Sequence, residues 1–356
     1  MGRPHRIGIV GLGFISTVYL ETLSKAPDAV ITAVADLDAA RAAAVAQTLP
    51  SARALSVAEL LAQDDVDVVL NLTIPAAHAE IALAAISHGK DVYGEKPLAA
   101  SFDDASRIIA EASAAGVRVG CAPDTVLGTG VQTARAVMDA GEIGRPLAAT
   151  AVMVTPGHER WHPNPDFYYQ PGGGPLLDMG PYYVTALVQL LGPVVSVIGA
   201  ASRLRPERVI GSGPRAGQRF AVAVDSHVTG VLEHASGALS TLTTSFDGVA
   251  TKAPNIEVHG EAASLIVPDP NLFDGDVLQH PLDGEGWDAV PPRAGIVGAA
   301  RGVGLLDMMR EDAPRASGDM GLHVLEIMTG LLESARSGAR VALSTTVERP
   351  ALVPLG

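Results

Sequence analysis

The sequence predicts an α/β fold in two parts: an N-terminal Rossmann domain with a doubly wound parallel sheet, and a C-terminal α/β domain with an open, predominantly antiparallel sheet. Up to about residue 120, short β-branched apolar runs alternate with Ala-rich segments of helical period, which is typical of parallel strands joined by crossover helices. A glycine-rich turn joins the first run to the first helix. Between residues 194 and 267, strand-like runs follow one another directly, which indicates antiparallel pairing.

Length and composition exclude several classes of protein. A chain of 356 residues suggests about two domains, and 47% hydrophobic residues are too many for an intrinsically disordered chain. The 25 Lys and Arg against 39 Asp and Glu give a net charge of −14, which argues against a nucleic-acid partner. No apolar run reaches the roughly 18–20 residues of a membrane helix. The lone Cys121 and the lack of a signal-peptide cleavage site predict a cytoplasmic protein.

The N-terminal domain is predicted over residues 1–124. Its expected strands are Arg6–Val10, Val30–Ala35, Val66–Leu72, Asp91–Gly94 and Val117–Gly120, and its expected helices are Phe14–Lys25, Leu37–Thr48, Ser56–Gln63, Pro75–His88 and Phe102–Ala115. Ser56 and Ser101 each precede an acidic residue by three positions, which is capping-box spacing. Gly116 stands where a helix of this domain should end.

The C-terminal domain is predicted over residues 125–356. Helices are expected at 130–140, 178–191 and 321–336, a strand at 147–155, a Pro/Gly-rich loop at 156–175, antiparallel strands over 194–267, and irregular surface over 268–300. Ser236 and Gly237 are expected to form a hairpin turn within the antiparallel region. Its Val- and Thr-rich strands leave an apolar sheet face, which predicts a homodimer or homotetramer.

The glycine-rich turn predicts a dinucleotide site. Gly8, Gly11 and Gly13 allow a tight turn and a close approach to a pyrophosphate at the helix N-terminus, and Ser16 keeps a small residue at the third position. Asp36 ends the second strand 23 residues after Gly13, where its carboxylate would accept the ribose hydroxyls and repel a 2′-phosphate. NAD is therefore expected, with NADP as the alternative, on Gly11, Gly13, Phe14, Ile15 and Asp36. An ordinary tight turn for the glycines and a helix N-cap role for Asp36 stay open.

Glu95, Lys96 and Pro97 directly follow the strand predicted over Asp91–Gly94. The carboxyl ends of strands in an open parallel sheet face the ligand, so Lys96 is expected to point at substrate. Lysine beside a nicotinamide and a hydroxyl can polarise that oxygen and help to move its proton. A cis bond is the candidate conformation between Lys96 and Pro97.

Three stretches resemble motifs of the glucose–fructose oxidoreductase and inositol dehydrogenase family, Gfo/Idh/MocA. They are Gly-Lys-x-Val-x-x-Glu-Lys-Pro at 89–97, Thr73-Ile-Pro75 followed by His78, and residues 172–182, which resemble Gly-Gly-Gly-x-x-x-Asp-x-Gly-x-His. In the second stretch, one residue is inserted between Thr and Pro relative to the family pattern. The resemblance covers nearly the whole chain and implies an NAD(P)-dependent oxidoreductase acting on a hydroxyl-bearing carbon of a sugar, polyol or related substrate. It adds Thr73, Pro75, His78, Glu95 and Lys96 to the cofactor site.

Tyr182 occupies the position at which the family motif has His. Family members resembling glucose–fructose oxidoreductase and dimeric dihydrodiol dehydrogenase carry Tyr there, whose hydroxyl donates or accepts the proton. Asp178 and Tyr182 are four residues apart, so on a helix they share one face. The resemblance implies that Lys96, Tyr182 and Asp178 are catalytic, with Tyr182 exchanging the hydroxyl proton and Asp178 orienting the pair. The alternative, in which Tyr182 and Tyr183 are core aromatics and Asp178 is an N-cap, stays open.

The loop before the Gly172–Tyr182 motif is expected to contact substrate, because it combines hydrogen-bonding groups with an aromatic face. The expected substrate contacts are Lys96, His158, Trp161, Asp178 and Tyr182, with Asp124 or Thr125 as a further candidate. The string His-Glu-x-x-His at 158–162 also matches a zinc protease motif, but the flanking prolines oppose the helix that this motif needs, so no metal is expected. The alternative, that this stretch is only a stiff surface loop, stays open.

Two other functions remain compatible with these motifs. One is an NAD-dependent glycoside hydrolase, in which transient oxidation of a sugar labilises the glycosidic bond. The other is a non-catalytic NAD-binding regulator, against which the retained Lys96, Asp178 and Tyr182 argue.

Overall fold

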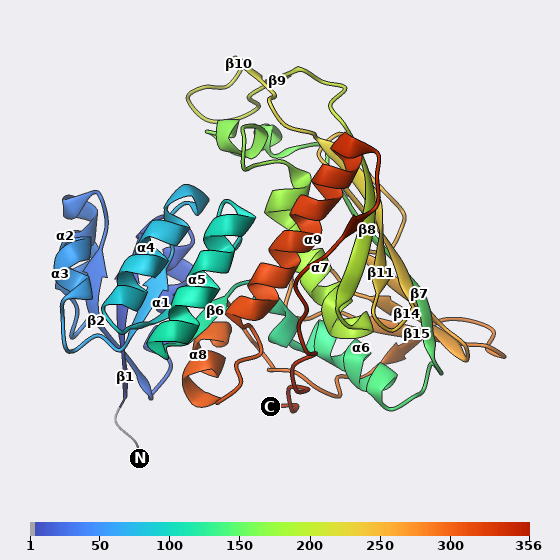
Figure 1. Cartoon of the computed structure of the whole chain (residues 1–356), viewed down its shortest axis with the longest axis horizontal. Helices are drawn as coiled ribbons and strands as arrows, with labels where there is room; N and C mark the ends of the chain where they lie inside the picture. Colours follow the sequence, from blue (N-terminus) through green and yellow to red (C-terminus); the bar gives the residue numbers. More distant parts are fainter. Residues whose placement is uncertain (1–3) are drawn as a thin grey trace. The chain divides into compact units, whose positions relative to one another are not determined.

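The computed structural model describes residues 4–356, which form two compact units (Figure 1). The first unit contains the described residues up to Thr125 together with Ala299–Leu322, and the second contains Val126–Gly298 and His323–Gly356. The expected division at residue 124 therefore differs in one segment, because 299–322 returns to the first unit.

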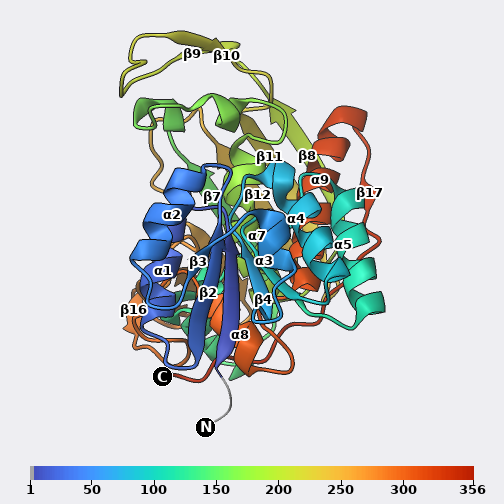
Figure 2. The same cartoon turned by 90° about the vertical axis from the view of Figure 1, so that its left-hand side faces the viewer.

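A six-stranded parallel sheet forms the centre of the first unit, in the order β3-β2-β1-β4-β5-β6. Its strands are β1 (His5–Val10), β2 (Ala29–Ala35), β3 (Arg53–Ala54), β4 (Val68–Asn71), β5 (Asp91–Gly94) and β6 (Val119–Cys121). The helices that follow strands are α1 (Ser16–Ser24), α2 (Ala39–Gln47), α3 (Val57–Leu61), α4 (Pro75–Ser87) and α5 (Phe102–Ala115). Figure 2 shows α1 and α2 on one side of this sheet and α4 and α5 on the other. The predicted Rossmann fold is confirmed.

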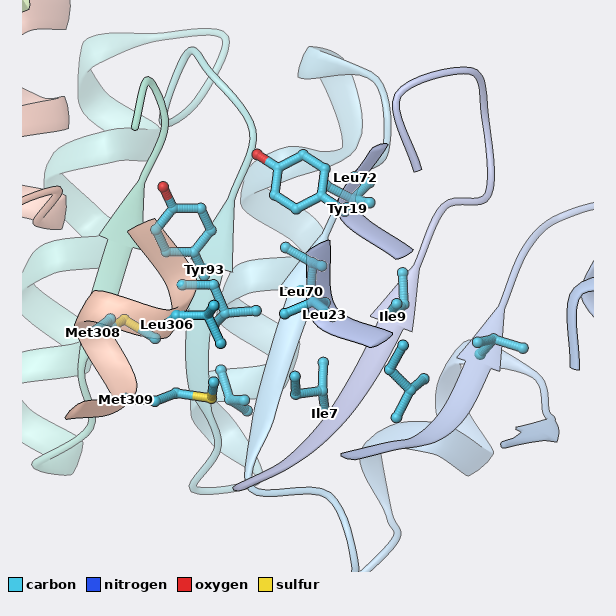
Figure 3. Packing of buried hydrophobic residues seen from close by; sticks show 14 of the residues in the cluster. Ile7, Ile9, Tyr19, Leu23, Leu70, Leu72, Tyr93, Leu306, Met308 and Met309 are labelled. Carbon is cyan, nitrogen blue, oxygen red and sulfur yellow. The ribbon is translucent and has the colours of Figure 1, made fainter. Parts of the chain in front are cut away.

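Local sequence explains these elements. Ser56 forms the predicted capping box with Glu59, Ser101 accepts a hydrogen bond from the backbone of Asp104, and Gly116 ends α5 in the left-handed conformation. In the apolar core of this unit, Ile7, Ile9 and Leu70 from the strands pack with Tyr19 and Leu23 of α1 (Figure 3). Strand β3 was not predicted, because it has two residues and both are exposed.

The sequence did not predict that residues 299–322 belong to the first unit, and this was the main error in this part of the chain. This segment contains α8 (Val303–Arg310), whose Leu306, Met308 and Met309 join the core of the first unit beside Tyr93 (Figure 3). The backbone N–H of Cys121, in β6, donates to Ala316 O, which ties the segment to the sheet edge. A single short helix surrounded by Gly and Pro carries too little periodicity to be assigned from sequence.

The second unit is built on a nine-stranded sheet in the order β16-β15-β14-β13-β7-β12-β11-β8-β17, with only β12 and β7 parallel. The strands are β7 (Pro146–Val154), β8 (Val194–Ser202), β11 (His227–His234), β12 (Leu239–Ser245), β13 (Ile256–Gly260), β14 (Ala263–Val267), β15 (Val277–Pro281), β16 (Asp288–Val290) and β17 (Val341–Ala342). A separate hairpin pairs β9 (Glu207–Val209) with β10 (Arg219–Ala221). The predominantly antiparallel sheet is confirmed, and Gly237 forms the predicted turn between β11 and β12 with positive φ. The expectation of irregular structure over 268–300 was wrong at β15 and β16, which are short strands in which only Val277 is buried.

Helices pack on one face of this sheet. They are α6 (Thr129–Asp139), α7 (Pro175–Leu191) and the part of α9 (Gly318–Ser337) that belongs to the second unit; short 3-10 turns lie at η1 (Thr125–Leu127), η2 (His158–Arg160) and η3 (Asp166–Tyr169). Figure 1 shows α7 and α9 along the sheet. Helices α7 and α9 pack so closely that a Cβ at Gly180 of α7 would lie 2.8 Å from the sulfur of Met328 in α9. Within residues 4–356, none of the helices is both long and apolar enough to cross a membrane.

Candidate cofactor and acid–base sites

The glycine turn after β1 has the shape that a pyrophosphate requires. Gly11 has φ +93°, and a Cβ there would lie 2.7 Å from the carbonyl carbon of Leu72, so only glycine fits. A Cβ on Gly13 would meet no atom within 4 Å. Among the described residues, no acceptor takes the backbone N–H groups of Gly13, Phe14 and Ile15. The turn therefore presents open N–H groups at the N-terminus of α1, where an anion is favoured.

Asp36 lies at the end of β2 and holds this turn in place. Its Oδ2 accepts the N–H of Leu12 at 2.8 Å and its Oδ1 accepts the N–H of Asp38 at 2.8 Å. The N-cap of α2 is Asp38, so the alternative of Asp36 as the cap is excluded. Each carboxylate oxygen keeps a second lone pair, with which it can accept a ribose hydroxyl. Arg41, 3.4 Å from the Asp36 carboxylate, was missed in the sequence and is a cation within reach of a 2′-phosphate.

Three large apolar side chains stand in solvent around this turn. Phe14 is 96% exposed, and Leu37 and Ile74 are also exposed. They follow β1, β2 and β4, and the carboxyl ends of these parallel strands lie at the same edge of the sheet. Apolar side chains gathered at one exposed edge indicate a ligand surface, which suits the flat rings of a dinucleotide. Periodicity could not identify Leu37 or Ile74, since both lie between elements.

His78 lies behind the cofactor loops. The side chain is 2% exposed, with Nδ1 2.7 Å from Pro97 O and Nε2 3.0 Å from Thr73 O. Burial lowers the pKa of His78. His78 thus links the loop after β4 to the loop after β5, while Pro75 opens α4 at its first turn and is exposed. His78 therefore holds the two loops in position from the interior, whereas Thr73 lies in the loop after β4 itself.

Glu95 positions Lys96 in a similar way. Glu95 is buried; its Oε1 accepts the Tyr19 hydroxyl at 2.8 Å, and its Oε2 accepts the backbone N–H of Lys96 at 3.1 Å. Burial raises the pKa of Tyr19 well above its ordinary value, so the hydroxyl stays a donor. The Lys96–Pro97 bond is cis, as expected, and Lys96 is half-buried.

In the second unit, Asp178 and Tyr182 lie one turn apart on α7. The helix begins at Pro175 with Gly174 as its N-cap, three residues before the predicted start, which excludes the cap role for Asp178. Tyr182 is 5% exposed. Tyr183 is a core aromatic whose hydroxyl accepts from Asn255 Nδ2 at 2.8 Å.

The structure brings His158 to the same carboxylate. His158 Nε2 lies 2.9 Å from Asp178 Oδ2. Its ring packs against Phe246 at 4.4 Å and Tyr168 at 4.6 Å between centroids, with Trp161 at 5.3 Å. Trp161 is 60% exposed. A hydrogen-bonded imidazole and carboxylate therefore stand beside an open aromatic surface.

A buried network of hydrogen bonds and ion pairs holds the turn that carries His158. Glu159 accepts from Arg208 Nη1 at 2.8 Å and from the Tyr169 hydroxyl, and Arg208 also pairs with Asp247. The Arg208 guanidinium lies 4.8 Å from the centre of the Tyr169 ring. Residues 158–160 form one 3-10 turn, and Glu159 is buried, so the His-Glu-x-x-His string does not form the helix of a zinc protease. Arg208 was missed in the sequence analysis because it comes from a hairpin about 50 residues away.

Asp124 and Thr125 are not substrate contacts. Both are fully buried. Asp124 Oδ2 accepts the N–H groups of Gly302 and Gly304 at 2.7 and 3.1 Å, and so caps α8 of the returning segment. Burial raises the pKa of Asp124 to about 6.

Comparison with known proteins agrees with this arrangement. Residues 5–122 match the model of the oxidoreductase family with an NAD-binding Rossmann fold, and residues 131–266 match the GFO/IDH/MocA C-terminal domain. Inositol 2-dehydrogenase 3 of Saccharopolyspora erythraea is 39% identical over 42% of this chain and 45% of its own length. The 1,5-anhydro-D-fructose reductase of Ensifer adhaerens is 27% identical over 96% of this chain and 99% of its own. The structure of levoglucosan dehydrogenase with NADH and L-sorbose superposes with a TM-score of 0.79 at 21% identity, covering 97% and 100% of the two chains.

Proposed function

We propose that this chain, which belongs to the GFO/IDH/MocA family of NAD-binding oxidoreductases, transfers a hydride between NAD and a hydroxyl-bearing carbon of a sugar or polyol. The observation that most supports this is the carboxylate and phenol on one face of α7, beside an exposed tryptophan, in a chain whose other unit carries a pyrophosphate turn. NADP is the alternative cofactor, and Arg41 supports its use.

The cofactor residues divide by the part of NAD that they would hold. Gly11, Gly13, Phe14 and Ile15 would hold the pyrophosphate, and Asp36 the ribose. Thr73, Pro75 and Lys96 would hold the nicotinamide half, with His78 and Glu95 keeping their loops in place. When bound, NAD supplies hydride chemistry at C4 of its ring.

Lys96, Tyr182 and Asp178 are the proposed catalytic residues. Lys96 polarises the substrate oxygen with its positive charge, Tyr182 exchanges the hydroxyl proton, and Asp178 orients the hydrogen bonds around it. His158 and Trp161 contact substrate, the latter by offering an exposed ring to the C–H face of a sugar. Relatives that are named for inositol and anhydrofructose support this substrate class.

Replacing Tyr182 by Phe tests the proposed function. Turnover should fall by roughly 10²–10⁴, the usual contribution of general acid–base catalysis, while NAD affinity stays nearly unchanged. Tyr183→Phe is the matched control, because its hydroxyl bonds Asn255 in the core and should affect stability instead. Full activity of Tyr182→Phe would remove Tyr182 from the mechanism.

The two other functions predict different outcomes. A glycoside hydrolase of this type returns the reduced cofactor in every cycle, so a glycoside would be cleaved without accumulation of NADH. A regulator would bind NAD without turnover, and Lys96→Ala would leave its behaviour unchanged.

We also propose a cytoplasmic homodimer or homotetramer. Ile198, Val231 and Leu239 are exposed, and Ile198 pairs with Val231 across β8 and β11 while the next pair, Val197 and Leu232, is buried. The exposed side chains therefore lie on the face away from the helices, and exposed apolar surface on a sheet is usually covered by a partner. Cys121 is buried, and burial raises the pKa of its thiol, which suits an inert cysteine in a reducing compartment.

A further inference from the structure

His158 and Asp178 form a pair that the sequence analysis assigned only as separate substrate contacts. The family motif has a His four residues after its Asp, where this chain has Tyr182. Here an imidazole reaches the same carboxylate from 20 residues earlier in the chain, at 2.9 Å. We propose that His158, held by Asp178, is the terminal proton acceptor of the oxidation and receives the proton that Tyr182 takes from the substrate hydroxyl. This inference rests on the proposed function.

The hydrogen bond decides which nitrogen of His158 is basic. An ionised carboxylate only accepts, so neutral His158 must carry its proton on Nε2 to bond Asp178. Nδ1 is then left with a lone pair, the form that accepts a proton. Protonation at Nδ1 gives an imidazolium whose charge Asp178 stabilises, which is the relation of base and orienting acid in a catalytic triad.

The surroundings hold the imidazole in one orientation. Phe246 and Tyr168 pack on the ring, and the next residue, Glu159, is anchored in the interior by Arg208 and Tyr169. Glu159 and Arg208 are both buried, so breaking their pair would be costly and the turn keeps its place. A rigid support of this kind is what a proton-transfer group requires.

Atoms and electrons balance with NAD⁺ as the oxidant. In the oxidation, the carbinol C–H bond breaks and its electron pair leaves as hydride to NAD⁺. The O–H bond breaks, its electrons form the carbonyl, and the proton passes through the Tyr182 hydroxyl to Nδ1 of His158. Tyr182 lies one helical turn after Asp178 on α7, and His158 bonds the Asp178 carboxylate, so the three residues come together at this part of α7. In the reduction, the same proton returns to the substrate.

A pH dependence follows from this assignment. Of the charged or titratable groups around His158, Asp178 of α7 bonds its ring, Tyr168 of η3 packs on it, and His162 lies in the same loop. The next residue, Glu159, belongs to a network with Tyr169 of η3, Arg208 of β9 and Asp247 after β12. Glu159, Arg208 and Asp247 pair with one another, and burial raises the pKa of Tyr169, so Asp178 is the charge that His158 bonds directly. Oxidation should slow toward low pH, where imidazolium cannot accept the proton, and reduction should slow toward high pH.

The test is the pH profile of kcat/KM in both directions for wild type and His158→Gln. We expect kcat to fall by roughly 10²–10⁴ with KM little changed, and the acidic limb of the oxidation to disappear. Added imidazole should restore part of the turnover of His158→Ala. His162→Gln is the matched control, because it removes a ring from the same loop and should leave the profile as it was.

A His158→Gln variant with the wild-type pH profile would overturn the inference. If His158→Gln does not fold, Asp178→Asn answers the same question: loss of the acidic limb supports the pair, and its retention overturns it. A wild type that binds NAD but turns over no polyol would remove the proposed function itself, whereas an active wild type with an unaltered His158→Gln profile would remove this inference alone.

Discussion

Asp36 has a structural role in the glycine turn, and we propose that the same carboxylate also selects the cofactor. It accepts the N–H of Leu12 in the glycine turn, and it carries the negative charge that would repel a 2′-phosphate. Arg41 lies 3.4 Å away and is half exposed. Cofactor choice in this chain is therefore a balance between one anion and one cation.

Replacing Asp36 by Ser should shift the preference toward NADP. Loss of the ribose contact costs about 1.5–3 kcal/mol, so kcat/KM for NAD should drop by roughly 10–100-fold. Use of NADP should rise, because Arg41 loses one of its two carboxylate partners, Asp36, keeps only Asp38, and can pair with the phosphate. The control is the double variant Asp36→Ser/Arg41→Ala, in which the gain for NADP should vanish. Unaltered cofactor preference in steady-state kinetics would contradict the role of Asp36.

Asp124 makes the stability of the first unit depend on pH. Its pKa is about 6 in the folded chain against the ordinary value of 3.8, because burial disfavours the carboxylate. The folded state thus binds this proton more tightly than the unfolded state, so the stabilisation is complete below about pH 4 and is lost as pH rises through about 6. A shift of about two units is worth roughly 3 kcal/mol.

Asp124→Asn should remove this dependence. The amide oxygen can still accept the N–H groups of Gly302 and Gly304, and it has no charge to desolvate. The variant should therefore gain free energy of unfolding relative to wild type between pH 4 and pH 8 in urea titrations. A constant difference between the two proteins across that range would show that Asp124 does not titrate in this way.

At the scale of elements, several contacts join the hairpin of β9 and β10 to the loop over 156–175, and one of them is made by the buried Arg208. Arg208→Met would leave the buried Glu159 without its cation, which costs about 3–5 kcal/mol when one partner of a buried pair is removed. Urea unfolding should show this loss, and Glu159→Gln added to Arg208→Met should recover part of it. Arg219→Met on the same hairpin breaks an exposed pair with Glu207 and should cost at most about 1 kcal/mol. Equal losses for the two arginines would contradict the network.

Elements with strong local signals could be predicted from the sequence, and contacts between distant elements could not. The runs around Ile7 and Val69, the cap at Ser56 and the glycine turn each carry their signal within a few residues. Asp178 and Tyr182 were paired because helical spacing alone decides it. His158 was not paired with Asp178, because a loop has no period that says where its side chains point.

The same limit explains the other misses. Arg208 meets Glu159 across 49 positions, and Asp124 caps a helix that begins almost 180 residues later. Both are polar groups that are buried together with a segment from elsewhere in the chain. The exposed Leu37 and Ile74 gain meaning only once β2 and β4 are known to end at the same edge as β1.

At the scale of the whole molecule, the open face of the nine-stranded sheet predicts association. Ile198 pairs with Val231, which pairs with Thr241, so an apolar and β-branched row crosses three strands. Ile198→Glu combined with Val231→Arg should give a monomer in analytical ultracentrifugation. Val209→Glu, an exposed position on the separate hairpin, is the control and should keep the wild-type mass. An unaltered mass for the double variant would exclude this face as the interface.

Reduction of NAD by the wild-type chain over a panel of aldoses, inositols and sugar acids tests the central proposal most directly. We expect at least one polyol or sugar to yield NADH in equal amount to a carbonyl product, because we propose that the glycine turn after β1 holds the pyrophosphate and that Asp178 and Tyr182 of α7 carry the acid–base chemistry. Saturable binding of NAD with no NADH from any member of the panel, or cleavage of a glycoside without NADH, would contradict it.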